Sequence, residues 1–72
     1  MEINVYNLAG NFLLGGVFWD TACLLRALKE HLSSDPVIAE AQAQGIRSLC
    51  DELPLAAVEY FYDLKIVLRK IS

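Results

Sequence analysis

Hydrophobic residues in the last third of the chain recur at the spacing of one helix face. Between Leu53 and the C-terminus they are Ala57, Tyr60, Phe61, Leu64, Val67, Leu68 and Ile71, at steps of mostly three and four residues. Pro54 suits the first position of a helix, because its missing N–H would have no intrahelical partner there. Arg69 and Lys70 suit a last turn, where cations are favoured by the helix dipole. We therefore predict a helix over residues 54–71.

Two more helices are predicted upstream, over residues 17–32 and 36–52. In the first, one row holds Phe18, Thr21, Leu25, Leu28 and Leu32. Asp20 is either the N-cap of this helix or an acid in its first turn. The SSDP stretch at 33–36 separates the two helices, because Pro36 disfavours a helical conformation at Asp35, which then suits an N-cap. Gly45 weakens the middle of the second helix.

Residues 1–16 are predicted to form an N-terminal arm with a glycine-rich lead-in to the first helix. Ile3 and Val5 alternate with polar residues, so residues 2–8 are a short strand, an extended arm or the fraying start of a helix. A strand here is expected to pair with another molecule. The Gly15–Gly16 pair favours a turn or a loosened helical segment, and the alternative is the close approach of another backbone.

These elements predict a single all-α domain over residues 1–72, a helical hairpin or three-helix unit with a short N-terminal arm. Of its 72 residues, 56% are hydrophobic, against roughly 45–50% in ordinary soluble domains, glycine included. A chain of this size buries only about 60% of its unfolded surface. We therefore expect the surplus apolar surface to be covered by self-association, most simply as a homodimer.

The charge pattern argues against binding to nucleic acid. The net charge is −3, and the six basic residues are scattered along the chain. Residues 39–49 resemble the Ala-x-x-x-Gly-Ile core of a helix-turn-helix at Ala41, Gly45 and Ile46, which keeps a DNA-binding regulator as a minor alternative. Glu40 and Asp51, however, occupy positions that the motif fills with apolar residues.

The ionisable residues are not spaced for catalysis or metal binding. Cys23 precedes His31 by two helical turns, too far for a hydrogen bond between nucleophile and base. Asp51 and Glu52 are better explained as acids that favour the start of the next helix. Two cysteines and one histidine do not supply a tetrahedral zinc site. We expect no enzyme, no cofactor and no metal, with Cys23 and Cys50 as reduced packing residues.

The sequence also indicates where the protein resides. The apolar run from Ile3 to Trp19 contains three asparagines and has no basic segment before it, so it fits neither a membrane span nor a secretory signal. We expect no membrane span and a cytoplasmic location.

A second apolar row on the predicted last helix indicates a partner-binding face. The candidate residues are Leu55, Val58, Tyr62 and Ile66 in this row, with Phe18 and Trp19 from the first helix. The row is either covered by the other two helices or free to bind a partner through its aromatic anchors. The predicted function is a small protein-interaction module, such as an adaptor, a chaperone-like cofactor or an inhibitor. The alternative is a structural subunit of a helical homo-oligomeric assembly.

Overall fold

The fold combines one β-sheet with two α-helices. The computed structural model describes residues 1–52 and 54–70. In chain order the elements are β1 (Glu2–Asn7), β2 (Phe12–Val17), α1 (Thr21–Leu28), the short 3-10 helix η1 (Lys29–His31), α2 (Pro36–Asp51), β3 (Ala56–Phe61) and β4 (Leu64–Arg69). The prediction of an all-α domain is therefore wrong.

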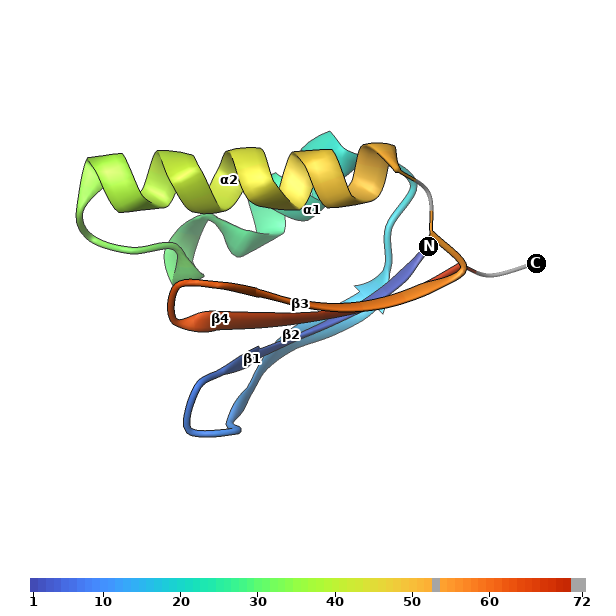
Figure 1. The fold of residues 1–72 in the computed structure, drawn as a ribbon, viewed down its shortest axis with the longest axis horizontal. Coiled ribbons are helices and arrows are strands. Elements are labelled where there is room, and N and C mark those ends of the chain that lie inside the picture. The colour runs from blue at the N-terminus through green and yellow to red at the C-terminus, as the bar shows by residue number, and fades with distance from the viewer. Residues whose placement is uncertain (53, 71–72) are drawn as a thin grey trace.

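The four strands form one antiparallel sheet in the order β2-β1-β4-β3. Two hairpins, β1–β2 and β3–β4, are joined at the middle of the sheet by the pairing of β1 with β4. Both helices lie on the same side of this sheet, so the molecule has one helical layer and one sheet layer (Figure 1). The other side of the sheet has no layer over it among the described residues, and we call it the open face.

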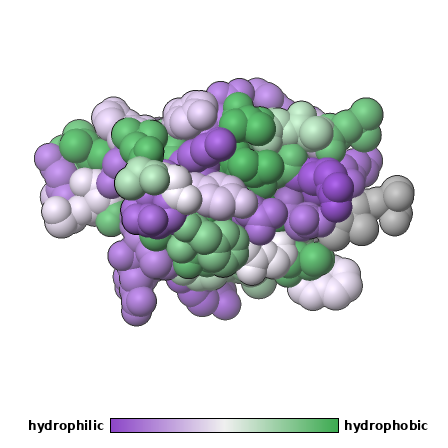
Figure 2. Space-filling view, turned by 90° about the horizontal axis from the view of Figure 1, so that it is seen from below, coloured by the Kyte–Doolittle hydropathy of each residue, from purple (hydrophilic) through white to green (hydrophobic). Residues whose placement is uncertain are grey.

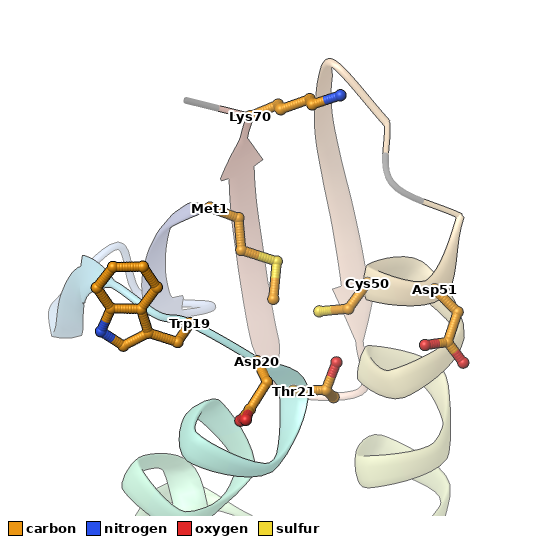
Figure 3. A pocket seen from close by; sticks show the side chains of 7 residues that line it. All are labelled: Met1, Trp19, Asp20, Thr21, Cys50, Asp51 and Lys70. Atoms are coloured by element: carbon orange, nitrogen blue, oxygen red, sulfur yellow. The ribbon is translucent and has the colours of Figure 1, made fainter. Parts of the chain in front are cut away.

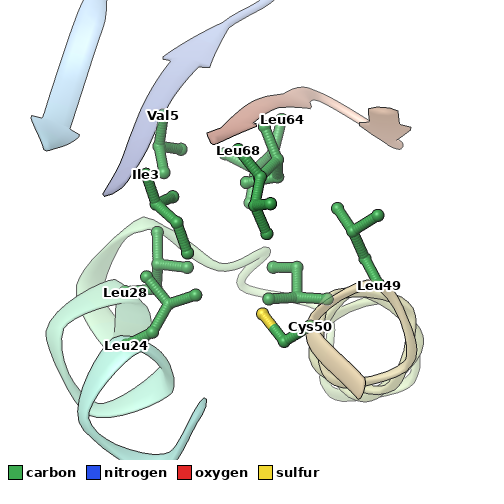
Figure 4. Packing of buried hydrophobic residues seen from close by; sticks show 10 residues of the cluster. Ile3, Val5, Leu24, Leu28, Leu49, Cys50, Leu64 and Leu68 are labelled. Atoms are coloured by element: carbon green, nitrogen blue, oxygen red, sulfur yellow. The ribbon is translucent and has the colours of Figure 1, made fainter. Parts of the chain in front are cut away.

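The core lies between the two layers. Side chains from β1 and β4 point toward side chains from α1 and α2 (Figure 4). The buried residues are Ile3, Val5, Leu24, Leu28, Ile46, Leu49, Cys50, Leu64, Ile66 and Leu68. The two central strands, β1 and β4, bury every second residue, because alternate side chains point to opposite faces of a sheet.

Aspartates begin both helices. The Asp20 carboxylate accepts a hydrogen bond from the backbone N–H of Cys23 at 2.8 Å, so α1 begins at Thr21 and not at residue 17. Asp35 accepts from the N–H of Val37 at 2.9 Å, and Pro36 occupies the first position of α2. The boundary that the SSDP stretch predicted is therefore present.

The helix predicted over 54–71 is instead the β3–β4 hairpin. Its two strands are joined by Tyr62 and Asp63, and Tyr62 has a φ of +60°. Leu64, Ile66 and Leu68 face the helices with a period of two. Apolar residues are so frequent in this segment that they also satisfy the helical period. Leu53 and Ile71, which the helical pattern included, lie outside the described residues.

The N-terminal segment is also a hairpin and not an arm. β1 pairs within the chain on both sides, with β2 and with β4, so it needs no second molecule. Its turn is stabilised by Asn7, whose backbone N–H donates to the carbonyl of Asn11 at 3.0 Å and whose side-chain oxygen accepts from the N–H of Asn11 at 2.9 Å. Gly10 adopts a φ of +87° there. The Gly15–Gly16 pair lies within β2 and forms neither a turn nor a helical segment.

Two contacts fasten the helical layer to the β3–β4 hairpin. The buried amide of Gln42 donates to the carbonyl of Phe61 at 3.1 Å and to the carboxylate of Asp63 at 2.7 Å, and it accepts from the N–H of Ser33 at 2.8 Å. The Phe61 ring packs directly on Gly45, where a Cβ would lie 2.5 Å from its Cδ1 atom. Gly45 therefore lets α2 and β3 approach closely at this point.

Candidate functional site

The open face of the sheet presents three rows of side chains, each running across all four strands. Their members follow from the strand register. In the order β2, β1, β4, β3, the first row is Phe12, Tyr6, Lys65 and Tyr60, the second is Gly15, Asn4, Val67 and Val58, and the third is Val17, Glu2, Arg69 and Ala56. Figure 2 looks toward this side of the molecule, where hydrophobic groups alternate with hydrophilic ones.

The first row consists of three aromatic residues and one lysine, which lies between the two tyrosines. We call it the aromatic row. The Tyr6 and Phe12 rings meet edge to face, with centroids 5.7 Å apart and an interplanar angle of 70°. The Lys65 ammonium lies 5.8 Å from the centroid of the Tyr6 ring, within the range of a cation–π interaction. Phe12 and Tyr60 are 59% and 60% exposed. Such large apolar groups gain little from folding, because more than half of their surface stays in water.

The neighbouring strand residues allow the Phe12 ring to lie flat. β2 carries a bulge at Leu13, since Val5 pairs with Leu14 but Tyr6 pairs with Phe12. This shift places Phe12 on the same side of the sheet as Gly15. A Cβ on Gly15 would lie 2.9 Å from the Cζ atom of Phe12 and would collide with the Asn4 side chain. The glycine therefore makes the space that the ring occupies.

Lys65 on the open face forms no ion pair with any residue that the structure describes. Arg69 is paired with Glu2 at 3.0 Å in the third row. This is the one ion pair among residues 1–52 and 54–70. A positive charge set between aromatic rings can pair with a carboxylate on an incoming molecule.

A pocket lies at the end of the molecule where β1 begins and α2 ends. It has a volume of about 370 Å³ and is lined by Met1, Trp19, Asp20, Thr21, Cys50, Asp51 and Lys70 (Figure 3). The Cys50 sulfur points into the pocket toward Met1 and Thr21, whereas the Trp19 indole is directed away from both.

The cysteines near this pocket are poor nucleophiles. Burial raises the pKa of the Cys50 thiol, and the charge of Asp51 raises it further. The pKa of the Cys23 thiol is also raised, because its hydrogen bond to the Asp20 carboxylate favours the protonated form. Reactive cysteines require the opposite shift. His31 lies on η1, beyond the far end of α1 from Cys23. Cys50 is buried in the core, as expected of a packing residue, whereas Cys23 is only half-buried and lies outside the core cluster.

The structure scatters the six residues that the sequence proposed for partner binding. Ile66 is fully buried in the core, and Phe18 is half-buried against it. Leu55, which directly precedes β3 in the chain, and Tyr62, which directly follows it, are both exposed. Trp19 is exposed in the connection between β2 and α1. Val58 alone lies on the open face.

Sequence reasoning missed the members of the aromatic row as a set. Tyr6, Phe12, Lys65 and Tyr60 lie far apart in the chain and come together only through the strand register. The one signal for them was the alternation around Ile3 and Val5, which marks Tyr6 as facing away from the core.

Comparisons with protein-family models, with curated proteins and with solved structures find no match to this chain. Over the described ranges, no cluster of three or more histidine, cysteine, aspartate or glutamate residues is placed to hold a metal ion. None of the helices in those ranges has the length and apolar character needed to cross a membrane.

Proposed function

We propose that this protein is a non-catalytic protein-interaction module whose binding surface is the open face of the sheet. The observation that carries the proposal is the aromatic row, in which Lys65 lies between Tyr6 and Tyr60 and Phe12 packs on Tyr6, on a face without a covering layer among the described residues. The partner that fits this row is a protein segment with apolar side chains and a carboxylate that pairs with Lys65. An adaptor, chaperone-like cofactor or inhibitor acts in this way, by occupying a surface of another protein.

The composition of the open face supports a protein partner. Tyrosine and phenylalanine are enriched at the centres of protein interfaces, because they bury much apolar area at little cost in side-chain entropy. In the second row, the side chains of Val67, Val58 and Asn4 are shorter than the rings, and the Phe12 ring lies over Gly15. A flat platform of this kind suits an extended or helical segment.

Single-stranded nucleic acid is the other ligand that stacks on aromatic side chains. Its affinity depends largely on the neutralisation of phosphates by basic residues. The chain has a net charge of −3, and its open face adds only Lys65 to a cation already paired with Glu2. This balance favours a partner with one or two carboxylates over a polyanion.

We place the protein in the cytoplasm, acting without a cofactor.

Selection from a random peptide library displayed on phage tests the proposal. Peptides retained by the immobilised protein should be rich in aliphatic or aromatic residues and carry an aspartate or glutamate. Tyr60→Ala should weaken their binding by roughly thirtyfold, the usual effect of removing an aromatic anchor of about 2 kcal/mol. Tyr62→Ala is the matched control, since the two tyrosines are 60% and 61% exposed and only Tyr60 lies on the open face.

A second pair of variants tests the charge. Lys65→Ala should weaken binding of the acidic peptides, whereas Arg47→Ala, which removes an exposed cation from α2, should leave it unchanged. Peptides that bind Tyr60→Ala as tightly as the unaltered protein would overturn the proposal. If the protein binds oligothymidylate more tightly than the selected peptides, and both Tyr60→Ala and Lys65→Ala abolish that binding, the proposal of a protein partner is overturned in favour of nucleic acid.

A further inference from the structure

We propose that strand β2 pairs antiparallel with β2 of a second copy of this chain, which joins two four-stranded sheets into one sheet of eight strands. This inference does not depend on the partner of the open face. It identifies the occupant of the sheet edge, and of the aromatic row it covers only Phe12, so Tyr6, Lys65 and Tyr60 of both copies stay free.

The backbone of β2 has hydrogen-bonding groups for which residues 1–52 and 54–70 provide no partner. The N–H of Phe18 donates to the carbonyl of Met1 at 2.9 Å. Because bonding alternates along an antiparallel ladder, Gly16 and Leu14 also bond to β1. Gly15 and Val17 then point their N–H and C=O groups outward. β2 is the last strand on its side of the sheet, so these groups face away from the sheet.

Charge distinguishes β2 from β3, the strand at the opposite edge. β2 contains no charged residue and no proline, two of the devices that keep edge strands from pairing, and its bulge at Leu13 lies near the start of the strand, before Gly15 and Val17. β3 contains Glu59 near its middle. In a two-fold pairing of β3 centred on Val58, the Glu59 carboxylates of the two copies would be diagonal neighbours, about 7–8 Å apart between Cα atoms, and would repel each other. Self-pairing is therefore favoured at β2 and opposed at β3.

The side chains at both ends of β2 also need cover. Val17 is 62% exposed, Phe12 59%, and Trp19, two residues beyond the strand, 95%. In a two-fold antiparallel pairing, the end of β2 in one copy lies beside the start of β2 in the other. Val17 and Trp19 of each copy then lie next to Phe12 and Leu13 of its partner. Pairing thus buries the most exposed aromatic residue of the molecule.

The position of Lys65 favours pairing of edges over stacking of open faces. Face-to-face association would bring the two lysines into one buried interface. In the eight-stranded sheet, five strand spacings separate Lys65 from its copy, about 24 Å at the usual spacing. This distance exceeds the Debye length of about 8 Å at physiological salt, so the two charges do not oppose the pairing.

The solution mass of the full chain over a hundredfold range of concentration tests the pairing, with two matched variants. Val17→Lys places a charge on the β2 edge, and Val58→Lys places one on β3, where the valine is similarly exposed at 53%. We expect a dimer for the unaltered chain and for Val58→Lys. Val17→Lys should raise the dissociation constant by roughly a hundredfold, since the pairing would place the charge of each lysine against the apolar side chains of Phe12 and Leu13 of the partner copy.

Amide hydrogen exchange and Trp19 fluorescence give a readout that does not depend on a variant folding correctly. At concentrations that favour the dimer, the amides of Gly15 and Val17 should become protected, while those of Val58 and Tyr60 continue to exchange. The emission of Trp19, the single tryptophan, should shift to shorter wavelength on dimerisation. A chain that is monomeric throughout the range would overturn the inference, as would a dimer disrupted by Val58→Lys and not by Val17→Lys.

Discussion

Asp20 acts on two neighbouring groups at once. Its carboxylate accepts the backbone N–H of Cys23 at 2.8 Å, and this hydrogen bond holds the pKa of Asp20 below its usual value. The same carboxylate raises the pKa of the Cys23 thiol. The sequence placed Asp20 correctly as a possible cap, because cap residues are recognised from their immediate neighbours.

Asp20→Asn should alter the dependence of stability on pH. The carboxyl has a lower pKa in the folded state than in the unfolded state, so its ionisation stabilises the fold above the unfolded pKa of about 4. That stabilisation is lost as the pH falls through the folded-state pKa. Asparagine also caps helices but does not titrate. Urea unfolding at pH 7, 5, 4 and 3 gives the free energy of unfolding of both proteins. Any excess of the unaltered protein over Asp20→Asn should disappear below about pH 4.

The same variant offers an independent check. Removing the carboxylate should lower the pKa of the Cys23 thiol, so alkylation of Cys23 by iodoacetamide at mildly alkaline pH should become faster. Cys50, whose pKa is raised mainly by burial, should react at an unchanged rate. Identical unfolding profiles and identical alkylation rates in both proteins would contradict the assigned role of Asp20.

At the scale of elements, the sequence predicted the helix that has strong end signals and failed on the strands. The Asp35–Pro36 pair defines the start of α2 from local chemistry alone. The β3–β4 hairpin lacks such a signal, since its two-residue turn is Tyr62–Asp63 and not the Asn-Gly or Asp-Gly typical of tight hairpins. Without a visible turn, apolar residues on both sides of Tyr62 were assigned to one continuous helix face.

Gly45 shows how one contact can reverse an expectation about an element. In isolation, Gly45→Ala favours the helix by about 1 kcal/mol. In the fold, the added methyl group meets the Phe61 ring, and overpacking of this kind costs about 1–3 kcal/mol. We expect Gly45→Ala to lower the free energy of unfolding by about 1 kcal/mol, measured by urea denaturation.

The control is the same substitution in a Phe61→Ala background. With the ring absent, the helix propensity of alanine is unopposed, so Gly45→Ala should now stabilise the protein by roughly 0.5–1 kcal/mol. If the substitution has the same sign in both backgrounds, the ring of Phe61 is not the reason for glycine at position 45.

At the scale of the molecule, Gln42 connects segments that the sequence shows as unrelated. Its amide joins the loop after η1 to α2 and to the turn of the β3–β4 hairpin. No sequence pattern marks this glutamine, because its partners, Ser33 on one side and Phe61 and Asp63 on the other, come from two separate parts of the chain. The residue is fully buried, so each of its polar atoms must find a partner inside the protein.

Gln42→Leu should therefore destabilise the whole fold. The substitution leaves the N–H of Ser33 and the carbonyl of Phe61 without their hydrogen-bond partner. Each such group lowers the free energy of unfolding by up to about 3 kcal/mol. Gln44→Leu is the control, since Gln44 is exposed on the same helix and bonds only to Glu40 at 3.1 Å. Urea denaturation should show a large loss for Gln42→Leu and a change within about 0.5 kcal/mol for Gln44→Leu. Equal effects would show that the buried network contributes nothing specific.

Composition predicted the most general property of the molecule, an excess of apolar surface, because the size of the chain limits how much it can bury. It could not predict where that surface lies. The open face and the β2 edge exist only because β1 and β4 meet in the middle of the sheet, a contact between residues at opposite ends of the chain.

That contact also determines how the chain must fold. Each hairpin can form within microseconds, but a lone two-stranded hairpin is only marginally stable. The centre of the sheet forms when β1 pairs with β4, and this pairing closes a loop made of nearly the whole chain. The rate of folding is then set by a single encounter between distant segments. The protein should therefore fold more slowly than a helical bundle of the same size, as mixed domains with long-range strand pairing do.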